Sequence, residues 1–210
     1  MSSQPLLDIK DLRVNYKVYG GVLQVVDGVD FVVHPGEKVG LVGETGCGKT
    51  STMKAILRIL PMPPAQIASG EIHFKGQNVL QMSQNDLYRV RGNGISMIFQ
   101  DPTAALNPVF TVGQQMEAVL KNATFDGKKL NKGSIKAASA AALTEVALAD
   151  PERLLKRYPV QLSGGMRLRV CIALGLYTIA ELLISEERGS SLDLNFQFKV
   201  LRLFHFLVEV

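Results

Sequence analysis

Two stretches near the start of the chain alternate between apolar and polar residues. A repeat of two is the pattern of a strand with one buried face, so we predict strands over residues 7–14 and 25–33. The apolar positions are Leu7, Ile9, Leu12 and Val14 in the first stretch and Val25, Val29, Phe31 and Val33 in the second.

A short apolar run, residues 38–42, follows the turn marked by Pro35 and Gly36. It leads straight into a glycine-rich loop, and we predict that it forms a strand. Residues 49–60 then have helical spacing, and we expect prolines 61, 63 and 64 to end that helix.

The rest of the chain mixes strands and helices. We predict strands over residues 71–75, 95–99 and 182–184 and a helix over Gly164–Leu176. Residues 111–156 are mostly helical in pattern, with a polar interruption at residues 122–133. This order predicts one α/β core with a helical lobe inserted in the middle.

The glycine-rich loop has the form G-x-x-x-x-G-K-[ST] between a predicted strand and a predicted helix. Glycines let backbone N–H groups close around phosphate oxygens, and the following helix directs its positive dipole end at the same anion. Lys49 is placed to reach the β- and γ-phosphates, and the Thr50 hydroxyl to bind Mg²⁺. The candidate nucleotide-contacting residues are Gly43, Glu44, Thr45, Gly46, Cys47, Gly48, Lys49, Thr50 and Ser51.

Composition adds limits to this interpretation. Hydrophobic residues make up 47% of the 210 residues, enough for a buried core. The net charge of +4 and pI of 9.1 mildly favour polyanionic partners. Cys47 and Cys171 form no paired motif, so a reducing cytosol is expected. Neither a signal peptide nor an apolar stretch of membrane-spanning length is found, so we expect any membrane role to be exercised from the surface, through another subunit.

A second glycine motif lies at Ser163, Gly164 and Gly165. By itself it is a good helix start, with Ser163 as the N-cap, but it also offers a second anion-binding helix N-terminus. Together with its neighbours the motif resembles the signature motif of ATP-binding-cassette (ABC) ATPases. The residues that carry this resemblance are Tyr158, Pro159, Gln161, Leu162, Ser163, Gly164, Gly165, Met166, Arg167 and Arg169.

Other segments resemble further motifs of that family in the family's order. Residues 98–102, with Gln100, resemble the Q-loop; residues 182–187 resemble the Walker B strand; and residues 191–193 resemble the D-loop. Tyr16 is the candidate for the aromatic residue that stacks on adenine, with Tyr19 as its rival. The resemblance covers residues 5–207. The residues of the glycine-rich loop and of the signature motif are similar to those of the oligopeptide, dipeptide and nickel importer branch.

The resemblance implies a fold of the P-loop NTPase type, as in ABC ATPases. This fold has an N-terminal antiparallel β subdomain and an inserted helical subdomain. We expect a single ABC ATPase domain over residues 1–210, with a core of about 1–100 and 160–210 and a helical subdomain of about 101–160. The C-terminal part of the core is expected to be missing.

The resemblance also implies roles for single residues. Lys49, Gln100 and Glu187 would be catalytic, and Thr50, Gln100 and Glu186 would hold Mg²⁺. Two cassettes pair head to tail in the family, so Ser163, Gly164 and Gly165 would bind ATP held by the partner.

The implied partners belong to a transport complex. They are a second ABC ATPase subunit, two transmembrane permeases and, indirectly, an extracytoplasmic binding protein, without nucleic acid. The expected location is peripheral, on the cytoplasmic face of the cell membrane. The Q-loop and residues 103–119 would form part of a groove for a permease helix.

The sequence departs from the family in several places. Glu186 stands where the family has Asp, Arg188 where it has Pro, and Leu168 where the branch has Gln. The family's switch histidine should come about 27 residues after Asp193, but the sequence ends 17 residues after it. This predicts a truncated or divergent form. Residues 192–200 alternate like a strand, whereas the family predicts a helix there, which we prefer.

Two alternatives to an active importer ATPase follow. Glu186 and the missing histidine allow a catalytically impaired or regulatory nucleotide-binding subunit. The basic pI allows a soluble ABC-type ATPase that acts on nucleic acid.

Overall fold

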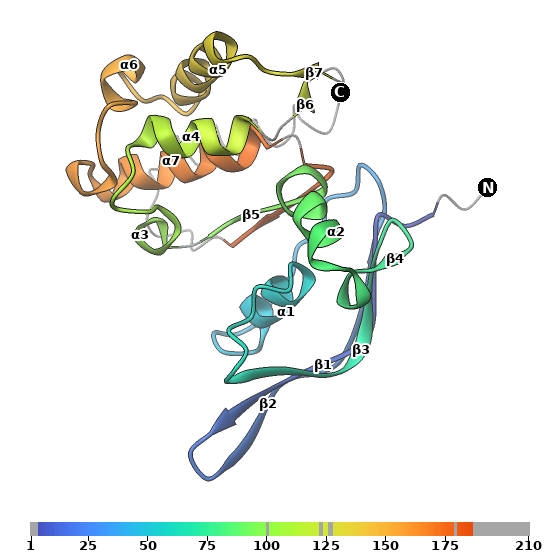
Figure 1. Ribbon diagram of the computed structural model, residues 1–210. Coiled ribbons are helices and arrows are strands. Elements are labelled where there is room, and N and C mark those ends of the chain that lie inside the picture. The colour runs from blue at the N-terminus through green and yellow to red at the C-terminus, as the bar shows by residue number, and fades with distance from the viewer. Residues whose placement is uncertain (1–3, 100, 122–123, 126–127, 179, 187–210) are drawn as a thin grey trace. The chain divides into compact units, whose positions relative to one another are not determined.

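The computed structural model of the chain describes residues 4–99, 101–121, 124–125, 128–178 and 180–186 (Figure 1). The chain forms two compact units, Met1–Arg89 and Val90–Val210, which we call the N-terminal and the C-terminal unit. The predicted division into a core and a helical subdomain at residues 101–160 stays a prediction. Residues 192–200, for which we preferred a helix, lie outside the described residues.

The N-terminal unit is built on a four-stranded antiparallel sheet in the order β2-β1-β3-β4. Its strands are β1 (Leu7–Val18), β2 (Gly21–Val33), β3 (Ala65–Phe74) and β4 (Gln77–Asn78). The predicted N-terminal antiparallel strands are therefore confirmed, although β1, β2 and β3 extend beyond the predicted bounds. The apolar positions of β1 that marked its pattern are all buried, namely Leu7, Ile9, Leu12 and Val14.

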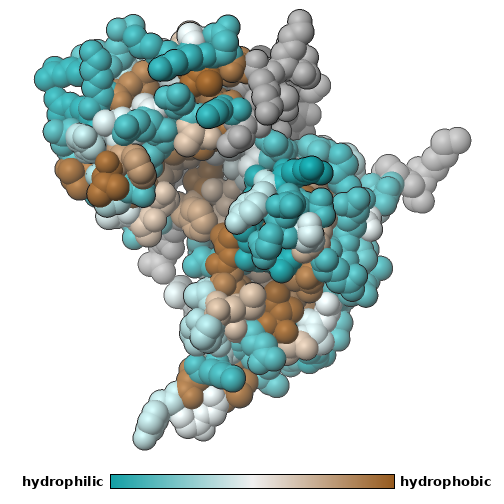
Figure 2. Space-filling view, viewed as in Figure 1, coloured by the Kyte–Doolittle hydropathy of each residue, from teal (hydrophilic) through white to brown (hydrophobic). Residues whose placement is uncertain are grey.

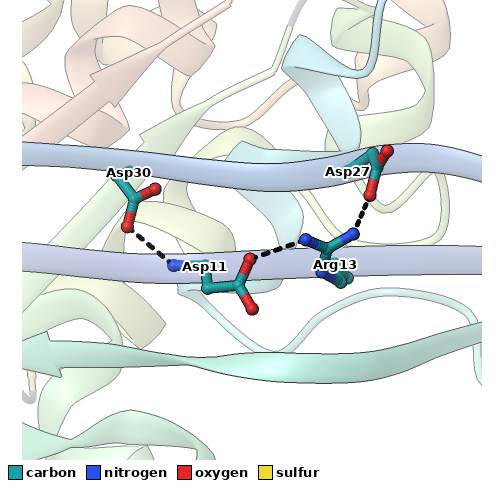
Figure 3. A network of polar contacts seen from close by, with 4 residues as sticks. All are labelled: Asp11, Arg13, Asp27 and Asp30. Atoms are coloured by element: carbon teal, nitrogen blue, oxygen red, sulfur yellow. Dashed lines mark hydrogen bonds and ion pairs between the residues drawn. The ribbon is translucent and has the colours of Figure 1, made fainter.

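A bulge in β1 explains why its apolar positions are not strictly two residues apart. The strand register shifts between Ile9 and Leu12, and Asp11 between them has a left-handed φ of 42°. In a regular strand residues three apart point to opposite faces, and the bulge brings Leu12 to the same buried face as Ile9. A polar network in Figure 3 holds the bulge. The backbone N–H of Asp11 donates to Asp30 at 2.8 Å, and Arg13 donates to Asp11 at 2.9 Å and to Asp27.

Two helices complete the N-terminal unit, α1 (Lys49–Ile56) and α2 (Gln84–Arg89), together with a 3-10 turn at Val79–Gln81. The predicted helix over residues 49–60 is wrong at its end, because α1 stops well before the prolines. Arg58 adopts a left-handed φ of 51°, and the N–H of Ile59 donates back to the carbonyl of Lys54 at 2.9 Å. This is the hydrogen bond of a Schellman C-terminus. The Arg58 guanidinium donates to the carbonyls of Val79 and Met82. These two hydrogen bonds hold Arg58 in its left-handed conformation.

The predicted strand over residues 38–42 is also wrong. The structure has no strand there, and Val39, Leu41 and Val42 are 49%, 40% and 93% exposed. A strand requires a neighbouring backbone to satisfy its hydrogen-bonding groups. Among the described residues no strand pairs with this segment. Its apolar character therefore does not produce a strand.

The C-terminal unit combines a two-stranded parallel sheet with helices. Strand β5 (Ile95–Ile98) pairs with β8 (Leu182–Ser185). An irregular turn at Val90–Gly94 precedes β5, and a 3-10 turn at Pro159–Gln161 precedes α7. The helices are α3 (Pro102–Ala105), α4 (Val112–Leu120), α5 (Lys132–Glu145), α6 (Pro151–Leu154) and α7 (Gly164–Leu176). A short hairpin of β6 (Thr124–Phe125) and β7 (Lys128–Lys129) joins α4 to α5.

Helices α4, α5 and α7 share one apolar core. Met116, Leu143 and Val170, one from each helix, are completely buried in it. A Cβ on Gly175 of α7 would lie 2.6 Å from Ile98 of β5, so helix and strand are in close contact. The predicted interruption between helices is confirmed, although α5 begins at Lys132, two residues earlier than the predicted bounds of 122–133 imply. The predicted bounds of helix α7, Gly164–Leu176, and the predicted mixed α/β class are confirmed as well.

Candidate functional site

The glycine-rich loop of the N-terminal unit closes tightly on itself before α1 begins. Gly48 is the N-cap of α1 with a left-handed φ of 94°. A Cβ on Gly48 would lie 2.5 Å from the carbonyl oxygen of Val25, and one on Gly43 would lie 2.7 Å from the Sγ of Cys47. Position 48 therefore requires glycine, because both its φ and the Val25 backbone exclude a side chain, whereas a side chain at Gly43 would displace the Cys47 thiol. The resulting loop leaves its backbone exposed between residues 43 and 46.

The side chain of Lys49 folds back over this loop. Its Nζ donates to the carbonyls of Gly43 and Glu44, at 2.6 Å each, and lies 3.4 Å from the Sγ of Cys47. The ammonium group is thus held at the loop, next to the N-terminus of α1. A positive charge and free helix N–H groups at one place favour an anion, phosphate above all. The glycine positions and Lys49 fit the phosphates of a nucleotide.

Tyr16 of β1 reaches the first turns of α1. Its hydroxyl lies 3.2 Å from the hydroxyl of Ser51, within hydrogen-bonding distance, and its side chain is half-buried. The rival aromatic residue, Tyr19, lies at the tip of the β1–β2 hairpin and is fully exposed. The structure therefore brings Tyr16, Ser51 and the glycine-rich loop together, and does not bring Tyr19 to them.

The second glycine motif starts helix α7 in the C-terminal unit. Ser163 is the N-cap, and its Oγ accepts a hydrogen bond from the N–H of Met166 at 3.3 Å. Gly164 and Gly165 are exposed, and a Cβ on either would meet open space. Leu162 anchors the motif in the core at 4% exposure. The exposed N-terminus of α7 is thus open to an anion from outside.

Arg167 positions this helix start, a role that the sequence did not indicate. Its Nε donates to the carbonyl of Leu162 at 3.1 Å, and its Nη1 donates to the hydroxyl of Thr103 at 3.2 Å. Thr103 belongs to α3, directly after the segment that resembles the Q-loop. The two motifs are therefore tied together by one side chain. Sequence offers no signal for a contact between residues 64 positions apart.

The acidic end of β8 lies beside the end of β5. The backbone N–H of Glu186 donates to the carbonyl of Ile98 at 3.1 Å, which continues the parallel ladder by one residue. Glu186 is therefore at the carboxyl edge of this sheet, where α/β proteins place ligands. Asp101, three residues after β5, caps α3 by accepting from the N–H of Thr103 at 2.8 Å. Gln100 and Glu187 lie outside the described residues.

Oxygen-donating side chains were expected for Mg²⁺ at Thr50, Gln100 and Glu186. Thr50 belongs to the N-terminal unit and Glu186 to the C-terminal unit. Within the described ranges, no group of three or more His, Cys, Asp and Glu side chains could hold a metal ion. The Mg²⁺ ligands stay a prediction, although hydroxyl and carboxylate oxygens are the donors that this ion prefers.

Two groups in the core of the C-terminal unit have altered acidity. Burial and, secondarily, the charge of Asp101 raise the pKa of Cys171 to about 12. Burial also raises the pKa of Tyr177, as does the hydrogen bond from its hydroxyl to Glu145 at 2.9 Å. Both side chains stay protonated at neutral pH. Cys171 is consequently a core residue without thiolate chemistry.

The length and hydropathy of the helices bear on whether the chain crosses a membrane. Among those that the structure describes, none combines the length and the apolar character that a bilayer span requires.

The comparisons with known proteins agree with these motifs. The ABC transporter family matches residues 26–188. The chain is 40% identical to the oligopeptide transport ATP-binding protein OppD of Bacillus subtilis over 94% of its own length. It is also 40% identical to the dipeptide transport ATP-binding protein DppD of the same organism over 96%. It spans 54% and 59% of these two relatives.

Solved structures show the same fold. The ATP-binding cassette MJ0796, in a dimeric post-hydrolysis state bound to ADP and Pi, matches 97% of this chain with a TM-score of 0.83 and 22% identity. The match covers 83% of that structure's chain. The Clostridium perfringens protein cbiO1, part of the ABC transporter complex cbiONQ, gives a TM-score of 0.70 and 24% identity over 99% of this chain and 75% of that one. The fold is thus that of an ATP-binding cassette, and the chain belongs to the ABC transporter family.

Proposed function

We propose that this chain binds and hydrolyses ATP as the subunit that powers an importer for peptides. The observation that carries the proposal is the Lys49 ammonium held at the exposed backbone of residues 43–46, at the N-terminus of α1. That arrangement is suited to the β- and γ-phosphates of a nucleoside triphosphate. The peptide cargo is inferred from relatives named as oligopeptide and dipeptide transport proteins. Nickel is the other cargo of the branch that the sequence resembles.

In this mechanism the loop neutralises phosphate charge. Lys49 leaves its carbonyl partners and, with the helix dipole of α1, stabilises the negative charge on the phosphates. Tyr16 supports the adenine ring by stacking. Glu187 orients the attacking water, assisted by Gln100, as in the family that the sequence resembles. Mg²⁺, held by Thr50, Gln100 and Glu186, would neutralise further charge on the phosphates.

A second subunit completes each nucleotide site in the proposal. Ser163, Gly164 and Gly165 of one copy supply the exposed N-terminus of α7 to ATP that is bound by the other. The γ-phosphate then bridges two positively polarised surfaces, and hydrolysis removes the bridge, so the pair opens. Two permeases on the membrane would convert closing and opening into alternating access, from the cytoplasmic face. An extracytoplasmic binding protein would deliver the cargo.

The test is ATP turnover by the purified chain, alone and with its candidate permeases. The proposal predicts turnover that Glu187→Gln abolishes while ATP binding is retained. It also predicts that the two permeases co-purify with the chain. Turnover that Glu187→Gln leaves unchanged would contradict the assigned role.

One observation favours a second candidate function, a regulatory nucleotide-binding subunit. Glu186 stands where the family has Asp, and its side chain is one methylene longer. Such a subunit would bind ATP without turnover in either the unmodified chain or Glu187→Gln. Glu186→Asp would then raise turnover if the longer side chain is the cause.

A further inference from the structure

Hydrogen bonds hold the first part of helix α3 in place. None of the four residues of α3 is buried, and the nearest core residue is Leu106, directly after the helix. The carboxylate of Asp101 accepts from the backbone N–H of Thr103 at 2.8 Å. The hydroxyl of the same threonine accepts from Nη1 of Arg167 at 3.2 Å. Without a buried side chain of its own, α3 depends on these polar contacts for its position.

The side chain of Arg167 contacts α3 and the start of α7 at the same time. The two helices lie side by side in the C-terminal unit (Figure 1). Nε of Arg167 donates to the carbonyl of Leu162 at 3.1 Å, one residue before the N-cap Ser163, while Nη1 donates to Thr103 of α3. The guanidinium is planar and rigid, so its two donors fix the position of Thr103 relative to Leu162.

Helix α7 does not need this contact in order to form. Ser163 caps its first turn, and six of its residues are buried. The charge of Arg167 lies near the positive end of the helix dipole, where no acidic residue offsets it, and this opposes stability. A charge that the helix start disfavours, making a contact that the helix does not require, indicates a role outside folding.

We propose that Arg167 is a positioning residue that makes α3 and the N-terminus of α7 move as one element. The inference rests on the proposed function and deepens it, because it concerns how the nucleotide site is regulated. In that function the start of α7 contacts ATP held by the other copy, and residues 103–119 receive a permease helix. A displacement of Thr103 by the permease is passed through Arg167 to Leu162 and the start of α7. Turnover thereby depends on the docked permease.

The effect on turnover follows from the short range of hydrogen bonds. Donors stabilise charge in a transition state when they lie about 2.7–3.1 Å from it. A misplacement of about 1 Å can therefore lower the rate about 100-fold. The hydrogen bonds of Arg167, at 3.1 and 3.2 Å, break beyond about 3.5 Å. While they are intact, α3 and the start of α7 cannot separate by the distance that would impair turnover.

The experiment is a double-mutant cycle on ATP turnover by the purified chain with its candidate permeases. Thr103→Val removes the hydroxyl and keeps the branched shape, Arg167→Gln removes the guanidinium, and a third protein carries both substitutions. Thr103→Ser keeps the hydroxyl. Thr144→Val is the matched control, because the hydroxyl of this exposed threonine donates to Ala140 of its own helix. Hydrogen exchange of backbone amides is followed in the same proteins.

We expect Thr103→Val and Arg167→Gln each to lower kcat about three- to tenfold, the effect of one hydrogen bond. The dissociation constant of ATP should stay unchanged, because the loop that binds it lies in the other unit. The double variant should lose no more than the worse single variant. Thr103→Ser should recover most of the turnover lost in Thr103→Val. Exchange at residues 166–168 should be faster in Thr103→Val, although α7 itself is unaltered, and Thr144→Val should leave it unchanged.

Full turnover in Thr103→Val, additive losses in the double variant, or an equal loss in Thr103→Ser would overturn the inference. Faster exchange confined to α3 would also overturn it. An unmodified chain without turnover would contradict the proposed function instead. The exchange measurement would then decide on the inference by itself, and an unchanged rate at residues 166–168 would overturn it.

Discussion

The hydroxyl of Tyr16 lies 3.2 Å from that of Ser51, which joins strand β1 to the helix that follows the phosphate loop. This contact fixes a half-buried aromatic ring beside the loop, while Tyr19, three residues later, is fully exposed. The sequence left both tyrosines as candidates for the aromatic residue that supports adenine. The hydrogen bond favours Tyr16.

The two tyrosines can be separated by substitution. We expect Tyr16→Ala to weaken ATP binding by about 5- to 150-fold, because stacking of a base on an aromatic ring contributes about 1–3 kcal/mol. Tyr16→Phe should have a much smaller effect, since the ring remains and only the bond to Ser51 is lost. Titration with ATP measures both, and Tyr19→Ala is the control. The assignment would be reversed by a Tyr19→Ala protein that binds ATP as poorly as Tyr16→Ala.

Gly48→Ala should destabilise the phosphate loop. Its φ of 94° costs a residue with a side chain about 1–2 kcal/mol, and the new Cβ would press on the Val25 carbonyl at 2.5 Å. We expect a lower melting temperature and loss of ATP binding. Gly40→Ala is the matched control, because a Cβ there meets nothing within 4 Å. A Gly48→Ala protein that melts and binds ATP like the control would contradict the close approach of Gly48 to the Val25 carbonyl.

Lys132→Glu should stabilise the chain. The substitution places a negative charge at the positive end of α5, which contributes about 0.3–1 kcal/mol, and creates a favourable pair with Lys136. Urea denaturation would show a higher midpoint with an unchanged slope. A midpoint that falls instead would contradict the electrostatic account of this helix.

Alkaline pH should destabilise the C-terminal unit. The pKa of Cys171 is raised from 9.0 to about 12 in the folded chain, so its stabilising effect is complete below pH 9 and is lost as pH rises toward 12. The loss should approach about 1.4 kcal/mol per pH unit in that interval. Cys171→Val keeps an apolar side chain and removes the titration. Its unfolding free energy should therefore fall less steeply with pH, and identical slopes would exclude this cause.

Local signals made several elements predictable. Ser163 before two glycines marked the start of α7, and the structure begins that helix at Gly164. The alternation in β1 predicted a buried face, and the odd step between Ile9 and Leu12 turned out to be a bulge. The glycine-rich loop was predictable because Gly46 and Gly48 have positive φ angles, a local backbone requirement that the spacing of the glycines records.

The errors arose where distant contacts decide the structure. Residues 38–42 have the composition of a strand. A strand forms only where a neighbouring strand satisfies its backbone hydrogen-bonding groups, and composition does not reveal whether such a neighbour is present. The end of α1 is set by Arg58, whose guanidinium binds carbonyls more than 20 residues away. The tie from Arg167 to Thr103 was missed for the same reason. Propensity is local, whereas these features depend on tertiary hydrogen bonds.

The central claim is that the loop around Lys49 binds the phosphates of ATP. Its most direct test is the dissociation constant of ATP, measured by calorimetry on the unmodified chain and on Lys49→Ala, with Lys10→Ala as the control and circular dichroism to verify folding. We predict that Lys49→Ala weakens binding at least about tenfold, the effect of losing about 1.4 kcal/mol of charge-assisted contacts. Lys10→Ala should bind like the unmodified chain. A folded Lys49→Ala protein with an unchanged dissociation constant would contradict the claim.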